Sequence, residues 1–267
     1  YRINRSGAKL AIVTEEHMEK VNSIRNNCPS LTHLITISGS TADGWVCMED
    51  SCRNASSDFE RSKVAPNKST DPMLIYFTSG TTSMPKMVER DHAYALAHTI
   101  TQKYWMTLRE TDTHWTLTDT GWAKAAWGLL FPPLIAGSTI MLFDSDGFDA
   151  EEHLRIIQDY KVTTFCAPPT VYRLFAQMDV SDYDLSSLRH CIGAGEPLNP
   201  EAMRSWKTAT GCDIYDGYGQ TETINIIANY PGMEIRPGSM GKPVPGLNID
   251  IIDDEGTQCP NDIVGHI

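Results

Sequence analysis

The chain has 267 residues, of which 41% are hydrophobic and 21% are charged, a composition that suits a folded globular protein and is not typical of disorder. Its 34 acidic and 22 basic residues give a net charge of −12, which argues against nucleic acid as a partner, because nucleic acid binds clustered lysine and arginine. No hydrophobic run reaches the roughly 18 residues of a membrane-spanning helix, so we expect no membrane span.

Short hydrophobic runs alternate with helical patterns along most of the chain. Strands are predicted at 8–13, 31–37, 73–78, 114–118, 139–143, 162–166, 189–192 and 213–215. Helices are predicted at 15–26, 91–107, 122–135, 150–160, 170–178 and 200–210. Strands that alternate with helices of about 10–15 residues indicate βαβ crossovers. The pattern therefore predicts an α/β fold with doubly wound, mostly parallel sheets and flanking helices.

Three segments follow from this pattern. Residues 1–72 are expected to be the remnant of a first α/β subdomain, with connecting loops around one short element between 38 and 71. Residues 73–225 are expected to form the α/β core. In 226–267 the helical signal disappears and proline and glycine accumulate, which predicts the start of a small β-rich segment, part of a distorted barrel. Because the chain begins at Tyr1 and stops just after a strand-like run, we expect it to be a piece of a longer protein.

Ligands of open α/β sheets bind beyond the carboxyl ends of the strands, so the loops after strands are the places to search. The first such loop, 78–86, contains five hydroxyl side chains, a glycine and Lys86, which together could surround a polyphosphate with donors and one cation. It is not a Walker A loop, because Pro85 precedes Lys86 where that motif has glycine. A solvated Ser/Thr turn is the alternative.

Three further loops contain candidate residues. In 192–197 small residues would let the backbone approach a flat ligand, with Glu196 as a buried acceptor, although a tight turn into a helix capped by Asn199 explains the segment almost as well. In 216–222, Tyr218 could stack on a base and Glu222 could hold Mg²⁺, and the alternative is a turn with a threonine cap. Trp122 is the first residue of a predicted apolar helix, where its side chain either lines a ligand site or belongs to the core.

The order and spacing of these segments resemble the adenylate-forming superfamily, which includes acyl-CoA synthetases, luciferases and the adenylation domains of peptide synthetases. The loop 78–86, Gly195-Glu196-Pro197 and residues 218–222 match three of its motifs in order. The chain is closer still to the medium-chain acyl-CoA synthetases, to which it is similar in 76–82, 85–87, 119–122, 167–173 and 218–223. The resemblance implies the large N-terminal domain of such an enzyme, without the C-terminal domain.

The resemblance implies that ATP and a carboxylic acid form an acyl-adenylate and pyrophosphate, and that the thiol of CoA then displaces AMP. It assigns the phosphates to the first loop, adenosine to Gly195, Glu196 and Pro197, the adenine amino group to Asp216 and the base to Tyr218. Thr221 would meet the α-phosphate and Glu222 would coordinate Mg²⁺; with Lys86, these two are the catalytic candidates. The full set assigned to ATP is Thr78, Ser79, Gly80, Thr81, Thr82, Ser83, Lys86, Gly195, Glu196, Pro197, Asp216, Gly217, Tyr218, Gly219, Gln220 and Thr221.

Gly219 and Trp122 are the residues that the resemblance assigns to the acyl group. In acetyl-CoA synthetases the position that matches Gly219 looks like a tryptophan, which closes a small acyl pocket. Glycine there admits a longer chain, and each buried CH₂ contributes about 0.8 kcal/mol. The resemblance therefore favours medium-chain fatty acids or related acids over acetate.

Two other functions stay open. One is a non-catalytic nucleotide- or acyl-binding module, motivated by Ser83 and Arg90, where the family has glycine and histidine, and by the expected absence of the family's C-terminal lysine. The other is a ligase for aryl or short-chain acids. We expect this chain alone to turn over poorly. The resemblance also implies the mitochondrial matrix as location, with the cytoplasm as the alternative.

Overall fold

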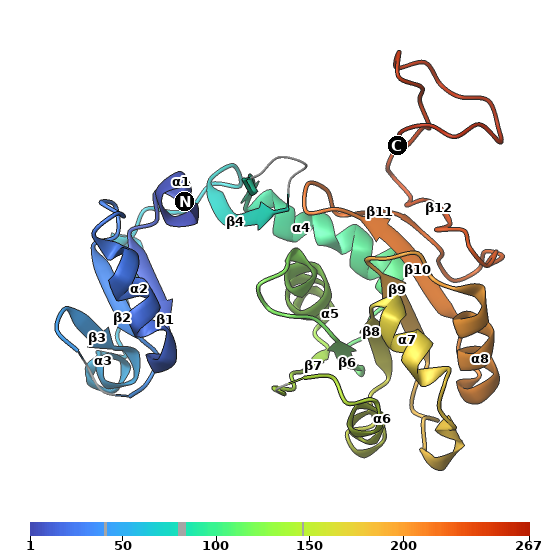
Figure 1. Ribbon diagram of the computed structural model, residues 1–267, viewed down its shortest axis with the longest axis horizontal. Coiled ribbons are helices and arrows are strands. Elements are labelled where there is room, and N and C mark those ends of the chain that lie inside the picture. Colours follow the sequence, from blue (N-terminus) through green and yellow to red (C-terminus); the bar gives the residue numbers. More distant parts are fainter. Residues whose placement is uncertain (40–41, 80–83, 146) are drawn as a thin grey trace. The chain divides into compact units, whose positions relative to one another are not determined.

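The computed structural model describes residues 1–39, 42–79, 84–145 and 147–267. Within them the chain forms two compact units, Tyr1–Asp91 and His92–Ile267 (Figure 1). No helix in these ranges is both long and apolar enough to cross a bilayer. The division of the chain into segments 1–72, 73–225 and 226–267 stays a prediction.

A small parallel sheet forms the beginning of the first unit, with strand order β1-β2-β3. Its elements are α1 (Arg2–Ser6), β1 (Leu10–Val13), α2 (Met18–Arg25), β2 (His33–Thr36), β3 (Trp45–Cys47) and α3 (Met48–Asn54). Met18 and Val21 of α2 pack on Leu34 and Trp45 of the sheet. Two predicted strands and one predicted helix are confirmed. The stretch 38–71, predicted to hold one short element, holds β3, α3 and a 3₁₀ turn at Arg61–Lys63.

An antiparallel hairpin completes the first unit. β4 (Pro72–Thr78) pairs with β5 (Lys86–Asp91), and Thr78 lies opposite Lys86. The sequence analysis predicted β4 but missed β5, because the polar run Lys86-Met87-Val88-Glu89-Arg90-Asp91 has no clear alternation of its own. Its strand conformation comes from pairing with β4, which is a tertiary effect.

The second unit is built on an open seven-stranded sheet with strand order β12-β11-β10-β9-β8-β6-β7. Its strands are β6 (Thr113–Thr116), β7 (Thr139–Met141), β8 (Thr164–Ala167), β9 (His190–Ala194), β10 (Ile214–Gly219), β11 (Asn225–Ala228) and β12 (Lys242–Pro243). Strands β6 to β10 pair in parallel, and β11 and β12 extend the sheet in antiparallel pairing. The predicted mostly parallel α/β fold is confirmed.

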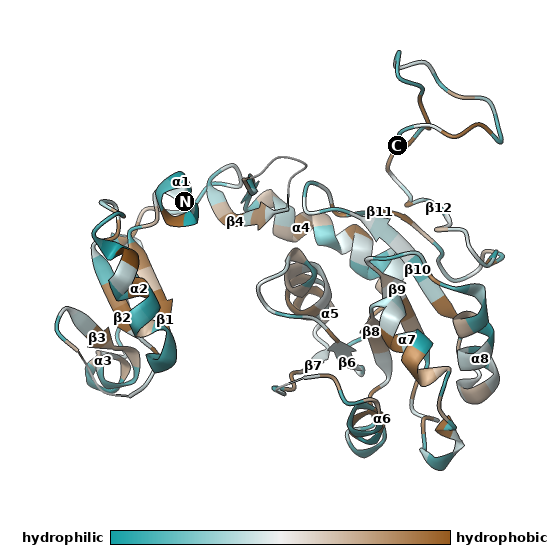
Figure 2. Ribbon diagram, in the orientation of Figure 1, coloured by the Kyte–Doolittle hydropathy of each residue, from teal (hydrophilic) through white to brown (hydrophobic). Residues whose placement is uncertain are grey.

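Helices cover both faces of this sheet, as a doubly wound fold requires. α6 (Ala150–Asp159), α7 (Pro169–Phe175) and α8 (Pro200–Thr210) pack against Phe165, Cys191 and Ile214. The alternate strand residues Cys166 and Ile192 pack instead in a second cluster on the opposite face. Figure 2 shows hydrophobic segments on α7 beside the strands, whereas α6 is largely hydrophilic on its outer side.

The helices of the second face contain two π-helical turns. The predicted helix 91–107 is α4 (Ala93–Ile100) continued by a π-helix at Thr101–Met106. The predicted helix 122–135 is a π-helix at Ala125–Leu130 followed by α5 (Phe131–Ala136). The helical predictions are confirmed, but their winding is not visible in hydrophobic periodicity. Turns of π-helix are rare and are frequently found at functional sites.

The last part of the chain contains little regular structure. β11 begins at Asn225 and joins the main sheet together with β12. Beyond them, two isolated bridges pair Ile252 with Gln258 and with His266. The predicted barrel is therefore not closed in residues 226–267, and the two strands of this segment belong to the open sheet instead.

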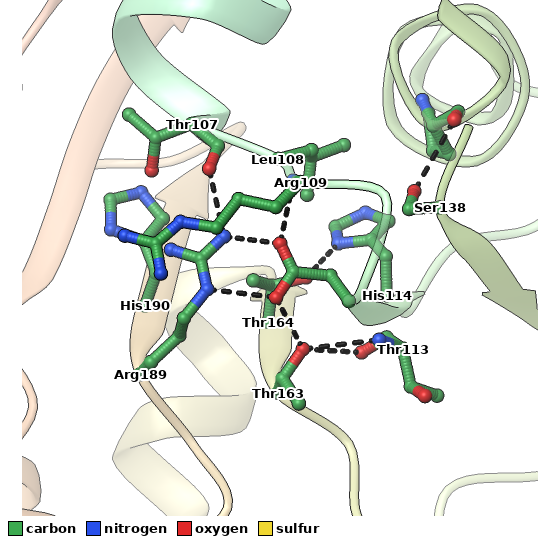
Figure 3. Close-up of polar contacts among 12 residues, drawn as sticks. Thr107, Leu108, Arg109, Thr113, His114, Ser138, Thr163, Thr164, Arg189 and His190 are labelled. Carbon is green, nitrogen blue, oxygen red and sulfur yellow. Dashed lines mark hydrogen bonds and ion pairs between the residues drawn. The ribbon is translucent and has the colours of Figure 1, made fainter. Parts of the chain in front are cut away.

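A buried ion pair holds together the amino-terminal ends of three neighbouring strands (Figure 3). Asp112, which is 3% exposed, accepts hydrogen bonds from the Arg189 guanidinium, the Thr163 hydroxyl at 2.8 Å and the Arg109 backbone N–H at 2.7 Å. Burial alone would raise the pKa of Asp112, but these hydrogen bonds outweigh burial and hold the pKa below its usual value. Asp112, Thr163 and Arg189 directly precede β6, β8 and β9, so one carboxylate fixes the start of all three strands.

We expect Asp112→Ala to lower the free energy of unfolding of the second unit by about 3–5 kcal/mol, because it leaves the Arg189 guanidinium without its anion. Urea unfolding followed by tryptophan fluorescence measures this, since five of the six tryptophans lie in 92–267. Glu234→Ala, which removes an exposed ion pair with Arg236, is the control and should cost no more than about 0.5 kcal/mol. Equal losses in the two variants would contradict the assignment.

Candidate functional site

The carboxyl ends of β9 and β10 bring two of the predicted segments together. In the parallel pairing of these strands, Gly193 lies opposite Asp216 and Ala194 lies opposite Gly217. Residues 195–197 follow β9 directly, and Tyr218 and Gly219 end β10. Because parallel strands end at the same edge of a sheet, the two segments are neighbours there. This edge is the candidate site of the second unit.

Asp216 is the buried acid of this edge. It is 6% exposed, and one of its carboxylate oxygens accepts the Gly217 N–H at 3.0 Å. Burial raises the pKa of Asp216 to about 7, and the hydrogen bond from Gly217 only partly opposes this. A carboxyl group that is expensive to keep buried is a typical feature of a functional site.

Glu196 differs from its prediction. It was expected to be a buried acceptor, but it is exposed. Its carboxylate accepts the Thr170 hydroxyl at 2.9 Å and a guanidinium N–H of Arg173 at 3.1 Å, both from α7. These hydrogen bonds lower the pKa of Glu196, so the side chain is a fixed anion at the site edge. Gly195, the residue before it, has φ of 110°, a conformation that glycine adopts readily.

Strand β10 extends further than predicted. The sequence analysis ended this strand at Tyr215, but it continues to Gly219, so Asp216, Gly217 and Tyr218 lie on the strand and not in a loop. The pairing with β11 shifts between Tyr218 and Gly219, as at a β-bulge. A Cβ atom at Gly219 would overlap the carbonyl oxygen of Ile224. The backbone therefore needs glycine at 219 whatever binds there.

A short turn follows β10. The Gln220 N–H donates to the Thr223 hydroxyl at 2.9 Å, so the capping threonine of the alternative interpretation is Thr223. Thr221 is half-buried and Glu222 is exposed. Among the described residues no group of three or more metal-ligating side chains occurs. Glu222 would therefore hold Mg²⁺ only together with oxygen atoms of a ligand, which is how Mg²⁺ usually binds.

The predicted phosphate loop belongs to the first unit. Thr78 ends β4, Ser79 is exposed, and Lys86 begins β5 with its side chain exposed. Gly80, Thr81, Thr82 and Ser83 lie outside the described residues. The other candidates belong to the second unit, so the convergence of all of them on one nucleotide stays a prediction.

Trp122 is 65% exposed, so it is not a core residue, and the alternative interpretation of Trp122 as part of the core is wrong. It lies in a turn in which the Gly121 N–H donates to the Asp119 carboxylate at 2.6 Å and the Trp122 N–H donates to the Asp119 carbonyl at 3.2 Å. An exposed indole is available to contact a ligand.

Lys124 is a candidate that the sequence analysis missed. It is 8% exposed, and its Nζ donates to the Ala194 carbonyl at 3.3 Å and lies 5.8 Å from the centre of the Trp127 ring. Burial lowers the pKa of Lys124, and no ion pair to it is found in the described part of the chain. The signal was present in the sequence, because Lys124 is the only charged residue between 122 and 135.

Comparisons with known proteins define the class. The family model of AMP-binding enzymes matches residues 1–267. The chain is 39% identical over 261 residues to the mitochondrial acyl-coenzyme A synthetase ACSM3 of Rattus norvegicus and 41% identical over 268 residues to the mitochondrial ACSM5 of Homo sapiens. Its fold matches the crystal structure of the anthranilate CoA ligase AuaEII in complex with anthranoyl-AMP, with a TM-score of 0.90 at 34% identity.

The chain therefore belongs to the AMP-binding enzyme family, as the resemblance predicted. The two sequence alignments cover 97% and 100% of this chain but only 44% and 46% of the synthetases ACSM3 and ACSM5. The structural alignment covers 99% of this chain and 51% of the anthranilate ligase. The chain thus spans about half the length of the relatives that it matches.

We expect Asp216→Asn to stabilise the protein increasingly as pH rises from about 4 to about 7. In this window the unfolded chain ionises Asp216 while the folded chain keeps the proton, so the wild type loses stability with rising pH. The rise of the pKa of Asp216 from its usual value to about 7 corresponds to a gain on the order of 4 kcal/mol at pH 8. Urea unfolding at several pH values measures it, with Asp213→Asn as control, because Asp213 is a half-buried aspartate that is ion-paired with Lys207. A gain that does not depend on pH would refute the burial argument.

Proposed function

We propose that the protein is an AMP-forming acyl-CoA synthetase. It would activate a medium-chain fatty acid or a related carboxylic acid with ATP to acyl-AMP and pyrophosphate, and then transfer the acyl group to CoA. The observation that supports this most is the pairing of β9 with β10, which places the segments 193–197 and 216–219 side by side at one edge of the sheet. Family membership and about 40% identity to named acyl-CoA synthetases support the same reaction.

The adenosine part of ATP would bind at this edge. The buried Asp216 carboxyl is an acceptor for the 6-amino group of adenine, which donates hydrogen bonds. The half-buried Tyr218 offers a ring face for stacking, and the backbone at Gly195 admits close approach of the ligand. Glu196, Pro197, Gly217, Gly219 and Gln220 would complete the adenosine contacts.

The phosphates would meet the hydroxyl-rich loop and Lys86, with Thr221 at the α-phosphate. Donors and a cation suit these anions, because the charge that accumulates there must be neutralised. Mg²⁺, when bound, would supply a further positive charge between the phosphate oxygens. The exposed Glu222 carboxylate fits a single protein ligand of such an ion.

The carboxylate of the acid substrate would be guided by Lys124. A buried cation is costly, and among the described residues no anion forms an ion pair with Lys124: it contacts a neutral carbonyl and the Trp127 ring, and the Glu196 carboxylate attracts it only at longer range. A substrate carboxylate near Ala194 would supply the missing anion beside the adenosine edge. Its oxygen would attack the α-phosphorus and pyrophosphate would leave; the CoA thiolate would then attack the carbonyl carbon and AMP would leave.

The acyl chain would extend past the exposed Trp122 and over Gly219. A medium chain gains about 0.8 kcal/mol for each CH₂ group that is buried there, which favours it over acetate. Aryl acids are the second candidate substrate class, since the ligase whose structure matches at a TM-score of 0.90 has an anthranoyl group bound as its adenylate. The mitochondrial matrix is the proposed location, because the relatives are named as mitochondrial.

A panel of C2 to C12 fatty acids and benzoate in an acid-dependent pyrophosphate-exchange assay on the intact gene product tests the proposal. We expect exchange to be greatest for medium-chain acids. Maximal exchange with benzoate would assign the aryl class, and maximal exchange with acetate would overturn the medium-chain assignment. ATP binding without exchange for any acid would favour a non-catalytic binding module.

We expect Lys124→Met to raise the KM for the acid by roughly tenfold or more without lowering the melting temperature. Methionine keeps the apolar volume and removes the buried charge, so stability should be unchanged or greater. The tenfold estimate corresponds to the loss of about 1.4 kcal/mol, as for one hydrogen bond to a charged group. Steady-state kinetics and thermal unfolding measure the two effects, with Lys103→Met as a control at an exposed lysine of the π-helix Thr101–Met106. An unchanged KM would remove Lys124 from the acid site.

A further inference from the structure

Trp105 connects the π-helix Thr101–Met106 to the candidate nucleotide strand. Its side chain is completely buried in the second unit. The indole N–H donates to the backbone carbonyl of Tyr215 at 3.1 Å, a bond that joins residues 110 positions apart. The Trp105 ring also lies against Gly217, where an added Cβ would come within 2.5 Å of the ring. One side chain therefore contacts β10 on both sides of Asp216.

The backbone of Trp105 is fixed as firmly as its ring. Its carbonyl accepts the Nε2–H of His190, the first residue of β9, at 2.7 Å. Two residues further on, the Thr107 carbonyl accepts a guanidinium N–H of Arg189 at 2.8 Å (Figure 3). Thr107 itself has φ of 46°, a left-handed conformation that ends the π-helix. The end of the π-helix is thus bound to the start of β9, while the indole reaches across to β10.

The geometry of the strand explains what this contact controls. Successive residues of a strand point to opposite faces, so Gly217 faces Trp105 while the Asp216 side chain points to the other face. On that other face the Asp216 carboxylate lies 3.8 Å from the position of a Cβ on Gly193. Holding Tyr215 and Gly217 in place therefore sets the position from which the Asp216 carboxyl reaches the ligand edge.

A second tryptophan from the other π-helix supports the same arrangement. Trp127 packs against Trp105 with ring centroids 5.4 Å apart, and Lys124 lies over the Trp127 ring. The two π-helices thus meet at a pair of indoles, one touching β10 and the other touching Lys124.

We propose that Trp105 is a positioning residue for purine recognition, which fixes the Tyr215–Gly217 backbone so that Asp216 reads the 6-amino group of the base. The inference rests on the proposed nucleotide site. If Trp105 were only part of the core, its replacement would lower stability and weaken all nucleotides equally. A positioning residue also changes the discrimination between ATP and ITP, which carries an oxygen in place of that amino group.

The test compares the dissociation constants of ATP and ITP by calorimetry on the intact gene product. In Trp105→Phe we expect ATP binding to weaken by about fivefold, as for the loss of one neutral hydrogen bond, and the ratio of the ITP to the ATP constant to fall by a similar factor. Trp115→Phe is the matched control, because Trp115 is a buried tryptophan that packs against His153 and Phe165 in the other core cluster. Its ratio should equal that of the wild type.

Two further variants make the result decisive. Asp216→Asn should by itself abolish the discrimination between ATP and ITP. If it does not, or if the wild type binds no ATP, both the nucleotide assignment and the role of Trp105 are refuted. If Asp216→Asn loses discrimination and Trp105→Phe keeps it, only the role of Trp105 is refuted. Should Trp105→Phe not fold, Gly217→Ala presses a methyl group against the same ring and against the Asn225 side chain, and is expected to reduce the ratio in the same way. A wild-type ratio in that variant would also refute the role of Trp105.

Discussion

The parallel register of β9 and β10 is the constraint on which the candidate site depends. It fixes Gly193 opposite Asp216 and Ala194 opposite Gly217, and so brings two segments about 20 residues apart in the sequence to one edge of the sheet. At the opposite ends of the strands the Asp112–Arg189 ion pair fixes the start of β9, and Trp105 bonds to both β9 and β10 through His190 and Tyr215. The polar network at the amino-terminal ends of the strands contains no predicted ligand residue, but it defines where the ligand residues lie.

Charge is buried in this unit for two different purposes. Asp112 is buried and has a full set of donors, so its carboxylate stays ionised and stabilises the fold. Asp216 and Lys124 are also buried, but Asp216 accepts a single backbone N–H, and Lys124 contacts a neutral carbonyl and the Trp127 ring. Buried ionisable groups with so few polar contacts reduce stability unless a ligand supplies further hydrogen bonds or an opposite charge. Under the proposed function, an adenine amino group and a substrate carboxylate would be the partners of these two groups.

Much of the architecture was predictable because local patterns and tertiary structure agree. The parallel strands, the helices α6 to α8 and the caps of α8 follow from hydrophobic periodicity and from Asn199 and Pro200. The predictions failed where a neighbour overrides the local pattern: β5 is a strand only because β4 pairs with it, and β10 continues to Gly219 because β11 lies beside it. Glu196 was expected inside, but α7 supplies Thr170 and Arg173 to hold it at the surface.

By itself the sequence determined the class of fold, the order of the motifs and the chemical types at the site, because each is set by residues close together in the chain. Only the tertiary structure decided which charged groups are buried without an ion pair among the described residues, as it did for Lys124, and which glycine is required by a neighbouring carbonyl, as it did for Gly219. Burial and close approach depend on atoms that are distant in sequence, as Trp105 and Tyr215 are. Such contacts leave no periodic trace in a single chain.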